Sequence, residues 1–213
     1  MLLFDLYELI ENGENGNVEF KRKFSSPEKI AKEMIAFANT RGGKIIFGVD
    51  DDRSVKGVES EKEEMELTAH AANYYCEPRI HYNLEILHIY KKDVVVIDVP
   101  ESKTKPHCLV ENNIPDPTKV YIRIKDKSVL ASKETINILK KSNPDAPPMI
   151  FDMGDKEKYL LDYLSKHDKI TVKTLRELLN LSQRRASRIL INLTRAELIR
   201  HHTNEKEDFY TIS

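Results

Sequence analysis

The chain lacks residues on which several classes of protein depend. Among its 213 residues there is no Trp and there are only two Cys, Cys76 and Cys108, which excludes a disulfide framework and a zinc site built mainly on thiolates. No apolar run approaches the roughly 18 residues that a membrane span needs. Asp5 follows the first methionine too closely for a secretory signal. We therefore expect a soluble protein of the reducing cytoplasm with no membrane partner.

The chain also has no excess of charge of one sign, but its positive and negative residues are unevenly distributed along the sequence. The chain has 34 Lys and Arg against 35 Asp and Glu, and with 9 Pro and 7 Gly its composition is that of an ordinary globular protein. Its length favours one domain of ordinary size and one small domain. Between Ser182 and Arg200 there are five arginines and one acid, Glu197, so positive charge is concentrated in that segment.

Proline marks the expected domain boundary. Three prolines, Pro144, Pro147 and Pro148, fall within five positions and disfavour both helix and strand. The sequence therefore predicts a first domain over residues 1–142 and a proline-rich linker over 143–152. A second domain is predicted over 153–213.

The first domain mixes helix and strand patterns. Ser26, Pro27 and Glu28 form a helix start, because serine caps, proline fits the first turn and glutamate meets the positive end of the helix dipole. Helices are predicted over residues 2–10, 26–39, 61–75 and 132–141, and strands over 17–20, 44–49, 55–58, 80–90, 93–99, 108–110 and 119–125. Since some strands follow one another directly and others are separated by helices, we expect an α+β fold with helices packed on a mixed sheet.

The second domain has the pattern of a winged helix-turn-helix. Helices are predicted over residues 155–166 and 172–179 and from Ser182 to about Ala196, with a short strand over 169–171 and two strands over 198–203 and 208–212. In the third helix, apolar residues such as Ala186, Ile189 and Leu190 share one face. The order of three helices followed by a hairpin is that of a winged helix.

The opposite face of the third helix carries the residues that a recognition helix needs. The candidates for nucleic-acid contact are Arg184, Arg185, Ser187, Arg188 and Arg195. A helix fits the major groove of DNA, and guanidinium groups bind guanine or phosphate with two hydrogen bonds. A solvated helix face or a protein-interaction module would show the same pattern. The segment 204–208 at the expected wing tip is net acidic, which argues against a phosphate contact by the wing.

Several motifs of the first domain resemble a known family. They are ENGNVEFK at 14–21, AFANTRGG at 36–43, IFGVDD at 46–51, KGV at 56–58, KPH at 105–107 and VYIR at 120–123. Over roughly residues 5–140 the chain resembles the Schlafen AlbA_2 domain, formerly called divergent AAA. The resemblance implies a DNA-binding domain. Bacterial proteins that join it to a C-terminal winged helix are called transcriptional regulators or helicase-related proteins.

An ATP-hydrolysing phosphate loop is not expected. Gly43 and Lys44 lack the upstream glycine of that motif, and Ile45 stands where Ser or Thr would hold magnesium.

Acidic residues suggest a second function. Glu14 and Glu19, with the turn 50–52, could gather carboxylates at one edge of the sheet, as Mg²⁺ or Mn²⁺ requires. Animal Schlafen proteins have a metal-dependent RNase site in this domain, and the resemblance implies Glu14, Glu19 and Asp51 as its metal-binding and catalytic residues here. An Asp-rich turn that is merely solvated is the alternative, and this chain has one copy of the domain where the animal nucleases pair two.

Further basic residues of the first domain would serve either function. Lys21, Arg22, Lys23, Arg41 and Arg123 are candidates for phosphate contact, although such residues are also common on solvated surfaces.

The sequence thus favours a nucleic-acid-binding protein, a regulator of transcription that contacts duplex DNA rather than RNA. We expect a homodimer, because regulators commonly contact two half-sites, and no cofactor. The alternatives are a metal-dependent nuclease with Mg²⁺ or Mn²⁺, and a protein-interaction module.

Overall fold

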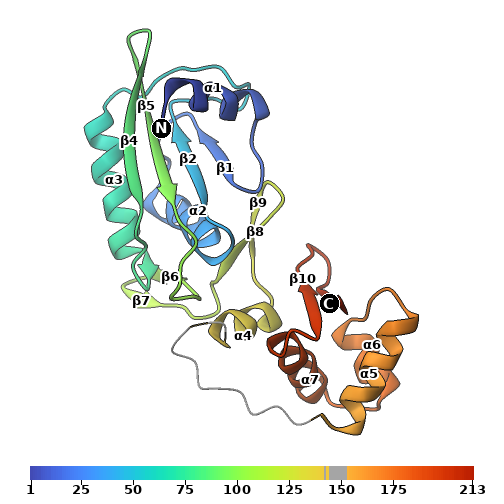
Figure 1. The fold of residues 1–213 in the computed structure, drawn as a ribbon. Coiled ribbons are helices and arrows are strands. Elements are labelled where there is room, and N and C mark those ends of the chain that lie inside the picture. The colour runs from blue at the N-terminus through green and yellow to red at the C-terminus, as the bar shows by residue number, and fades with distance from the viewer. Residues whose placement is uncertain (142, 144–152) are drawn as a thin grey trace. The chain divides into compact units, whose positions relative to one another are not determined.

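The computed structural model divides into two compact units, Met1–Ala131 and Ser132–Ser213. It describes residues 1–141, 143 and 153–213 (Figure 1). Apart from Asn143, the predicted linker over 143–152 lies outside the described residues. In the described part of the chain, none of the helices has the length and apolar character of a membrane span.

The first unit is built around a mixed four-stranded sheet, as predicted. Its elements are α1 (Leu3–Asn12), β1 (Val18–Lys21), α2 (Pro27–Asn39), β2 (Gly43–Phe47), α3 (Glu61–Tyr74), β3 (Cys76–Glu77), β4 (Asn83–Ile89), β5 (Lys92–Val99), β6 (Cys108–Glu111), β7 (Ile114–Pro115), β8 (Tyr121–Ile124) and β9 (Lys127–Leu130). The strand order is β1-β2-β5-β4, with β1 parallel to β2 and the other two pairings antiparallel. Small sheets of β3-β6-β7 and β8-β9 complete the unit.

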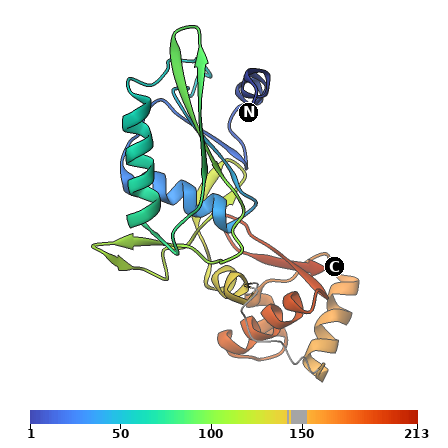
Figure 2. The ribbon, with the colours of Figure 1, turned by 60° about the vertical axis from the view of Figure 1, so that its left-hand side comes forward.

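Helices cover both faces of the sheet (Figure 2). Because side chains alternate along a strand, Ile45 and Phe47 of β2 pack with α2 and α3, whereas Ile46 between them faces the other way. On that second face, Leu6 and Ile10 of α1 are buried against the sheet. Two separate apolar cores therefore hold the sheet between its helices.

The turn between α2 and β2 explains the RGG motif. Gly42 has a φ of 73°, which favours glycine, and its N–H donates to the Phe37 carbonyl oxygen at 2.9 Å. A Cβ added to Gly43 would lie 2.3 Å from the Phe37 ring, so the strand can begin beside α2 only without a side chain. The motif leaves Arg41 exposed at the tip of the turn.

Two predicted strands are reduced in the structure. Residues 55–58 form only isolated bridges, Val49 to Val55 and Val58 to Asp93, because Gly48 has a φ of 93° and turns the chain out of the strand. The predicted strand over 169–171 is likewise a single bridge, between Ile170 and Tyr210. Conversely, the structure contains β9, for which the sequence predicts no strand.

The described residues of the second unit form four helices and a hairpin. They are α4 (Lys133–Lys141), α5 (Asp155–Lys166), α6 (Val172–Leu178), α7 (Gln183–Arg195), β10 (Ile199–His202) and β11 (Phe209–Ile212). Leu160 of α5, Leu175 of α6, Leu190 of α7 and Tyr210 of β11 are each 0% exposed and form one core. The predicted helices over 155–166 and 172–179 and the third helix are thus confirmed, together with the antiparallel hairpin.

The position of α4 differs from the predicted domain boundary at residue 142. Ile138 of α4 packs against the core of the second unit. The hydroxyl of Thr135 donates to Asp208 at 3.0 Å, and Ser132 also donates to Asp208. The unit boundary therefore falls before Ser132, because the apolar face of α4 is covered by the C-terminal core.

Candidate nucleic-acid interface and acidic cluster

Three of the five predicted contact residues of α7 lie on an exposed face of that helix. Ser182 caps the helix by accepting a hydrogen bond from the Arg185 N–H at 3.3 Å. Arg184, Arg185 and Arg188 are exposed and line a shallow hollow with Ser182, while Ala186, Ile189 and Leu190 on the other side of the helix are buried. Within the described residues, no acidic side chain forms an ion pair with these three arginines. Their charges are therefore available to an anionic partner.

Two other predicted contact residues of α7 lie toward α4. Ser187 is half-buried, and its hydroxyl donates to the Glu134 carboxylate at 2.6 Å, so the structure contradicts a free hydroxyl for nucleic acid. Arg195 is also half-buried. Ile191, which shares the arginine face by helical spacing, is only 4% exposed. The exposed arginine face is thus limited to the first half of α7.

Lysines of α4 contribute charge that the sequence analysis missed. Lys133 and Lys141 of α4 line a groove with Arg184 and Arg188 of α7. Burial and the charges of Arg195 and Arg188 lower the pKa of Lys141 below its usual range. The sequence places α4 in the predicted first domain, and no local pattern indicates that its lysines lie beside α7.

The hairpin tip is less acidic at its surface than its sequence suggests. Asp208 accepts hydrogen bonds from Ser132 and Thr135 of α4, and His201 of β10 lies 3.1 Å from the same carboxylate oxygen. Burial acts to raise the pKa of Asp208, but the hydrogen bonds from His201 and Ser132 outweigh it and lower the pKa. Asp208 thus points inward and joins the hairpin to α4.

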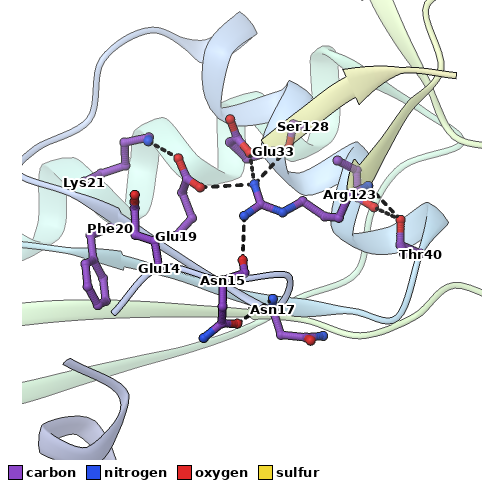
Figure 3. Close-up of polar contacts among 11 residues, drawn as sticks. Glu14, Asn15, Asn17, Glu19, Phe20, Lys21, Glu33, Thr40, Arg123 and Ser128 are labelled. Carbon is purple, nitrogen blue, oxygen red and sulfur yellow. Dashed lines mark hydrogen bonds and ion pairs between the residues drawn. The ribbon is translucent and has the colours of Figure 1, made fainter. Parts of the chain in front are cut away.

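Arg123 of β8 is a core residue rather than a phosphate contact (Figure 3). Its side chain is 2% exposed, and Nη1 donates to Glu19 at 3.1 Å and to Glu33 at 3.0 Å. Nη2 donates to the Asn15 carbonyl oxygen at 2.8 Å, and the guanidinium lies 4.7 Å from the centre of the Phe37 ring. The predicted phosphate contact by Arg123 is therefore wrong, because protein groups surround its guanidinium.

Two of the three predicted metal-binding carboxylates, Glu14 and Glu19, already have partners within the protein. Glu14 accepts a hydrogen bond from the Phe20 N–H at 2.8 Å, and Glu19 pairs with Lys21 and Arg123 (Figure 3). Burial raises the pKa of Glu14, and the charges of Glu19 and Asp51 raise it further. Asp51 is exposed. In the described ranges, no three His, Cys, Asp or Glu side chains form a group that could hold a metal ion.

The other basic candidates of the first unit are either paired with a carboxylate or exposed to solvent. Lys21 is half-buried and paired with Glu19. Arg22, Lys23 and Arg41 are exposed. Only these last three are positioned at the surface, as a phosphate contact requires.

Comparison with known families identifies the first unit. The family model described as Schlafen, AlbA_2 matches residues 14–132, which is more than half of the chain. The chain therefore belongs to the Schlafen AlbA_2 family. The matched range ends beside the boundary between the two structural units.

Individual relatives are distant and mostly longer. An uncharacterized ATP-binding protein from Ureaplasma parvum serovar 3 is 32% identical in an alignment 128 positions long, which covers 49% of this chain and 36% of that protein. Among solved structures, the DIP2311 protein from Corynebacterium diphtheriae matches with a TM-score of 0.49 and 14% identity, over 78% of this chain and 34% of that one. The N-terminal domain of a RecG-related protein from Nitrosomonas europaea matches with a TM-score of 0.41 and 21% identity, over 62% and 92% of the two chains. This chain thus spans about a third of the curated relative.

Proposed function

We propose that the protein is a DNA-binding regulator of transcription whose second unit is a winged helix. The observation that carries this proposal is the exposed set of Arg184, Arg185 and Arg188 at the start of α7, on a helix whose other side is buried. The first residues of a recognition helix are those that contact base edges in the major groove. Arginine is the residue most suited to guanine and phosphate.

The surrounding elements support α7 as the recognition helix. α6 ends at Leu178, and four residues later Ser182 caps α7, which is the short connection of a helix-turn-helix. β10 and β11 follow α7 as an antiparallel hairpin in the position of a wing. Arg22, Lys23 and Arg41 of the AlbA_2 unit supply further surface charge for the phosphate backbone. We expect duplex DNA to be preferred to RNA, a homodimer to bind two half-sites, and no cofactor to be needed.

ATP binding is not part of this proposal. The Ureaplasma parvum relative is named as an ATP-binding protein, but the chain covers 36% of it. Gly43-Lys44 is followed by Ile45 where a phosphate loop has Ser or Thr.

The proposed regulator can be tested by measuring duplex binding with variants that each lose one positive charge. Labelled duplex DNA and structured RNA would be titrated with the full chain and with Arg185→Gln, Arg188→Gln and Lys166→Gln, at several salt concentrations. Lys166 is the control, because it is an exposed cation of α5 paired with Asp162. We expect each arginine variant to weaken duplex binding by ~1–3 kcal/mol and Lys166→Gln to leave it unchanged. Salt-independent binding, or arginine variants that bind like the control, would overturn the proposal.

A metal-dependent nuclease is the second candidate. The observation in its favour is that Glu19 and Asp51 lie close enough to Glu14 for their charges to raise its pKa. In this proposal Glu14, Glu19 and Asp51 would hold Mg²⁺ or Mn²⁺ after rearrangement of their side chains, and the ion would supply activation of water against a phosphodiester. Asp51→Asn is the cleaner test, since Asp51 is exposed whereas Glu19 also holds Arg123. Manganese-dependent cleavage that is lost in Asp51→Asn would establish the nuclease.

A further inference from the structure

A groove of about 450 Å³ lies between α4 and α7, the neighbouring helices of the second unit in Figure 1. Lys133 and Lys141 line it from α4, and Arg184 and Arg188 line it from α7. Glu134 is the one acidic side chain among its lining residues in the part of the chain that the structure describes. The groove therefore has four cationic side chains against one carboxylate.

We propose that this groove binds a backbone phosphate of the duplex, so that α4 forms part of the DNA interface. The inference rests on the proposed function of α7 and adds a site on a helix outside the expected winged helix. The ligand is the phosphodiester group of a strand whose bases face the first half of α7.

The positive charge of the groove is not neutralised by its own carboxylate. Glu134 supplies one negative charge against four cationic side chains, and its carboxylate is held by a hydrogen bond from the Ser187 hydroxyl at 2.6 Å. Lys141 experiences the charges of Arg188 and Arg195, and together with burial they lower its pKa. Cations placed this close together repel one another, and a bound phosphate relieves that repulsion. An anion with several acceptor oxygens therefore fits this site better than a neutral ligand.

The groove is held in shape by contacts on both of its sides. Ser187 and Glu134 join α7 to α4, and Lys141 donates to the Asn192 side chain at 3.5 Å. Ile191 is 4% exposed and lies in the lining of the groove. At its other end, α4 is fixed by the hydrogen bond from Thr135 to Asp208. A preformed site of this kind loses little conformational entropy on binding.

Its place beside the exposed arginines points to a nucleic-acid phosphate. Arg184 and Arg188 belong both to the groove and to the exposed hollow that Arg185 also lines. In protein–DNA complexes, phosphate contacts on the flank of the recognition helix set its register, and base contacts supply the specificity. The lysines of α4 would serve the first role and the arginines of α7 the second.

Variants of α4 test the inference. Duplex affinity would be measured as a function of salt for the full chain, for the double variant Lys133→Gln/Lys141→Gln and for Lys140→Gln. Lys140 is the matched control, because it is an exposed lysine of α4 outside the groove lining. We expect the double variant to reduce the magnitude of the slope of log K against log salt by about 1, because one phosphate contact is lost, and to do so equally for all duplex sequences. A double variant with the slope and affinity of Lys140→Gln would overturn the inference.

A gain of binding supplies a test that misfolding cannot imitate. Glu134→Gln removes the negative charge of the groove but keeps an oxygen that can accept the Ser187 hydrogen bond. We expect this variant to bind duplex more tightly, by about threefold or more at low salt. Unchanged or weaker binding would contradict a phosphate in the groove.

The failure of this inference can be distinguished from failure of the proposed function. If the full chain does not bind duplex at all, both are wrong. If Arg185→Gln weakens binding and the variants of α4 do not, α7 contacts DNA and the groove takes no part. Arg185 serves this comparison because it lines the exposed hollow and not the groove.

Discussion

Nη1 of Arg123 lies 3.1 Å from Oε2 of Glu19, although the two residues are 104 positions apart in the chain. Arg123 belongs to the β8–β9 hairpin and Glu19 to β1 of the main sheet. Glu33 of α2 binds the same nitrogen at 3.0 Å. One buried guanidinium therefore joins a hairpin, a sheet and a helix.

Removal of this guanidinium should destabilise the first unit strongly. Arg123→Met leaves the buried Glu19 with Lys21 alone and the half-buried Glu33 without its cation, which costs roughly 3–5 kcal/mol of unfolding free energy. Urea denaturation followed by circular dichroism would measure the loss. Arg22→Met is the control, since Arg22 is exposed and should change stability by less than about 0.5 kcal/mol. Equal stability of the two variants would show that the network contributes little.

Glu33 should make stability depend on pH in a defined direction. Burial and then the charge of Glu19 raise the pKa of Glu33 above 4.5 in the folded chain. A raised folded pKa contributes stability that is present below pH 4.5 and is lost as the pH rises through the folded value. Glu33→Gln removes this titration. The difference in unfolding free energy between wild type and variant should therefore change across that window, and a constant difference would contradict the shift.

Asp208 should control the attachment of α4. Asp208→Ala removes the acceptor for Ser132, Thr135 and His201, and a hydrogen bond to a charged group contributes about 1.5–3 kcal/mol. We expect faster hydrogen exchange in α4 and weaker stability of the second unit. Glu207→Ala, at the exposed neighbouring position, is the control.

The same carboxylate predicts an acid response. The pKa of Asp208 is lowered from 3.8, so its contribution is complete above pH 3.8 and is lost as the pH falls through the lower folded value. The protection of α4 amides, expressed relative to their intrinsic exchange rate at each pH, should fall over that range in the wild type and stay constant in Asp208→Ala. A loss of protection that is the same in both proteins would exclude Asp208 as its cause.

Divalent metal should not be needed for duplex binding. Glu19 is engaged by Arg123 and Lys21, and Glu14 accepts the Phe20 N–H, so these carboxylates already have partners in the protein. Affinity measured with EDTA and with Mn²⁺ at equal ionic strength should agree. A manganese-dependent increase in affinity that disappears in Asp51→Asn would contradict this expectation.

The sequence predicted most helices and strands because their signals are local. Ser26, Pro27 and the apolar spacing of α2 determine where that helix begins and which face is buried. The same reasoning gave the mixed sheet. It did not give the position of α4, since an amphipathic pattern shows that a face is buried but not which core covers it. The Asp208 side chain that binds α4 is 73 residues beyond Thr135.

Prediction of the site was also limited by contacts between residues that are far apart in the sequence. Helical spacing correctly separated the exposed Arg184 and Arg188 from the buried face of α7. It could not distinguish Arg123 from Arg22, because burial of an arginine depends on carboxylates supplied by distant elements. Glu33, which completes the Arg123 network, was not a candidate residue, and its place in the middle of α2 gave no signal beyond its charge.

The attachment of α4 decides how this chain should be cut for separate expression. A fragment that starts after residue 152 would leave behind Thr135 and Glu134, and would expose Asp208 and Ser187 without their partners. A fragment that starts at Ser132 keeps these contacts, and the AlbA_2 match ends at the same position. The prolines come after α4 in the sequence, so a gene divided at these prolines would separate α4 from the core that covers it.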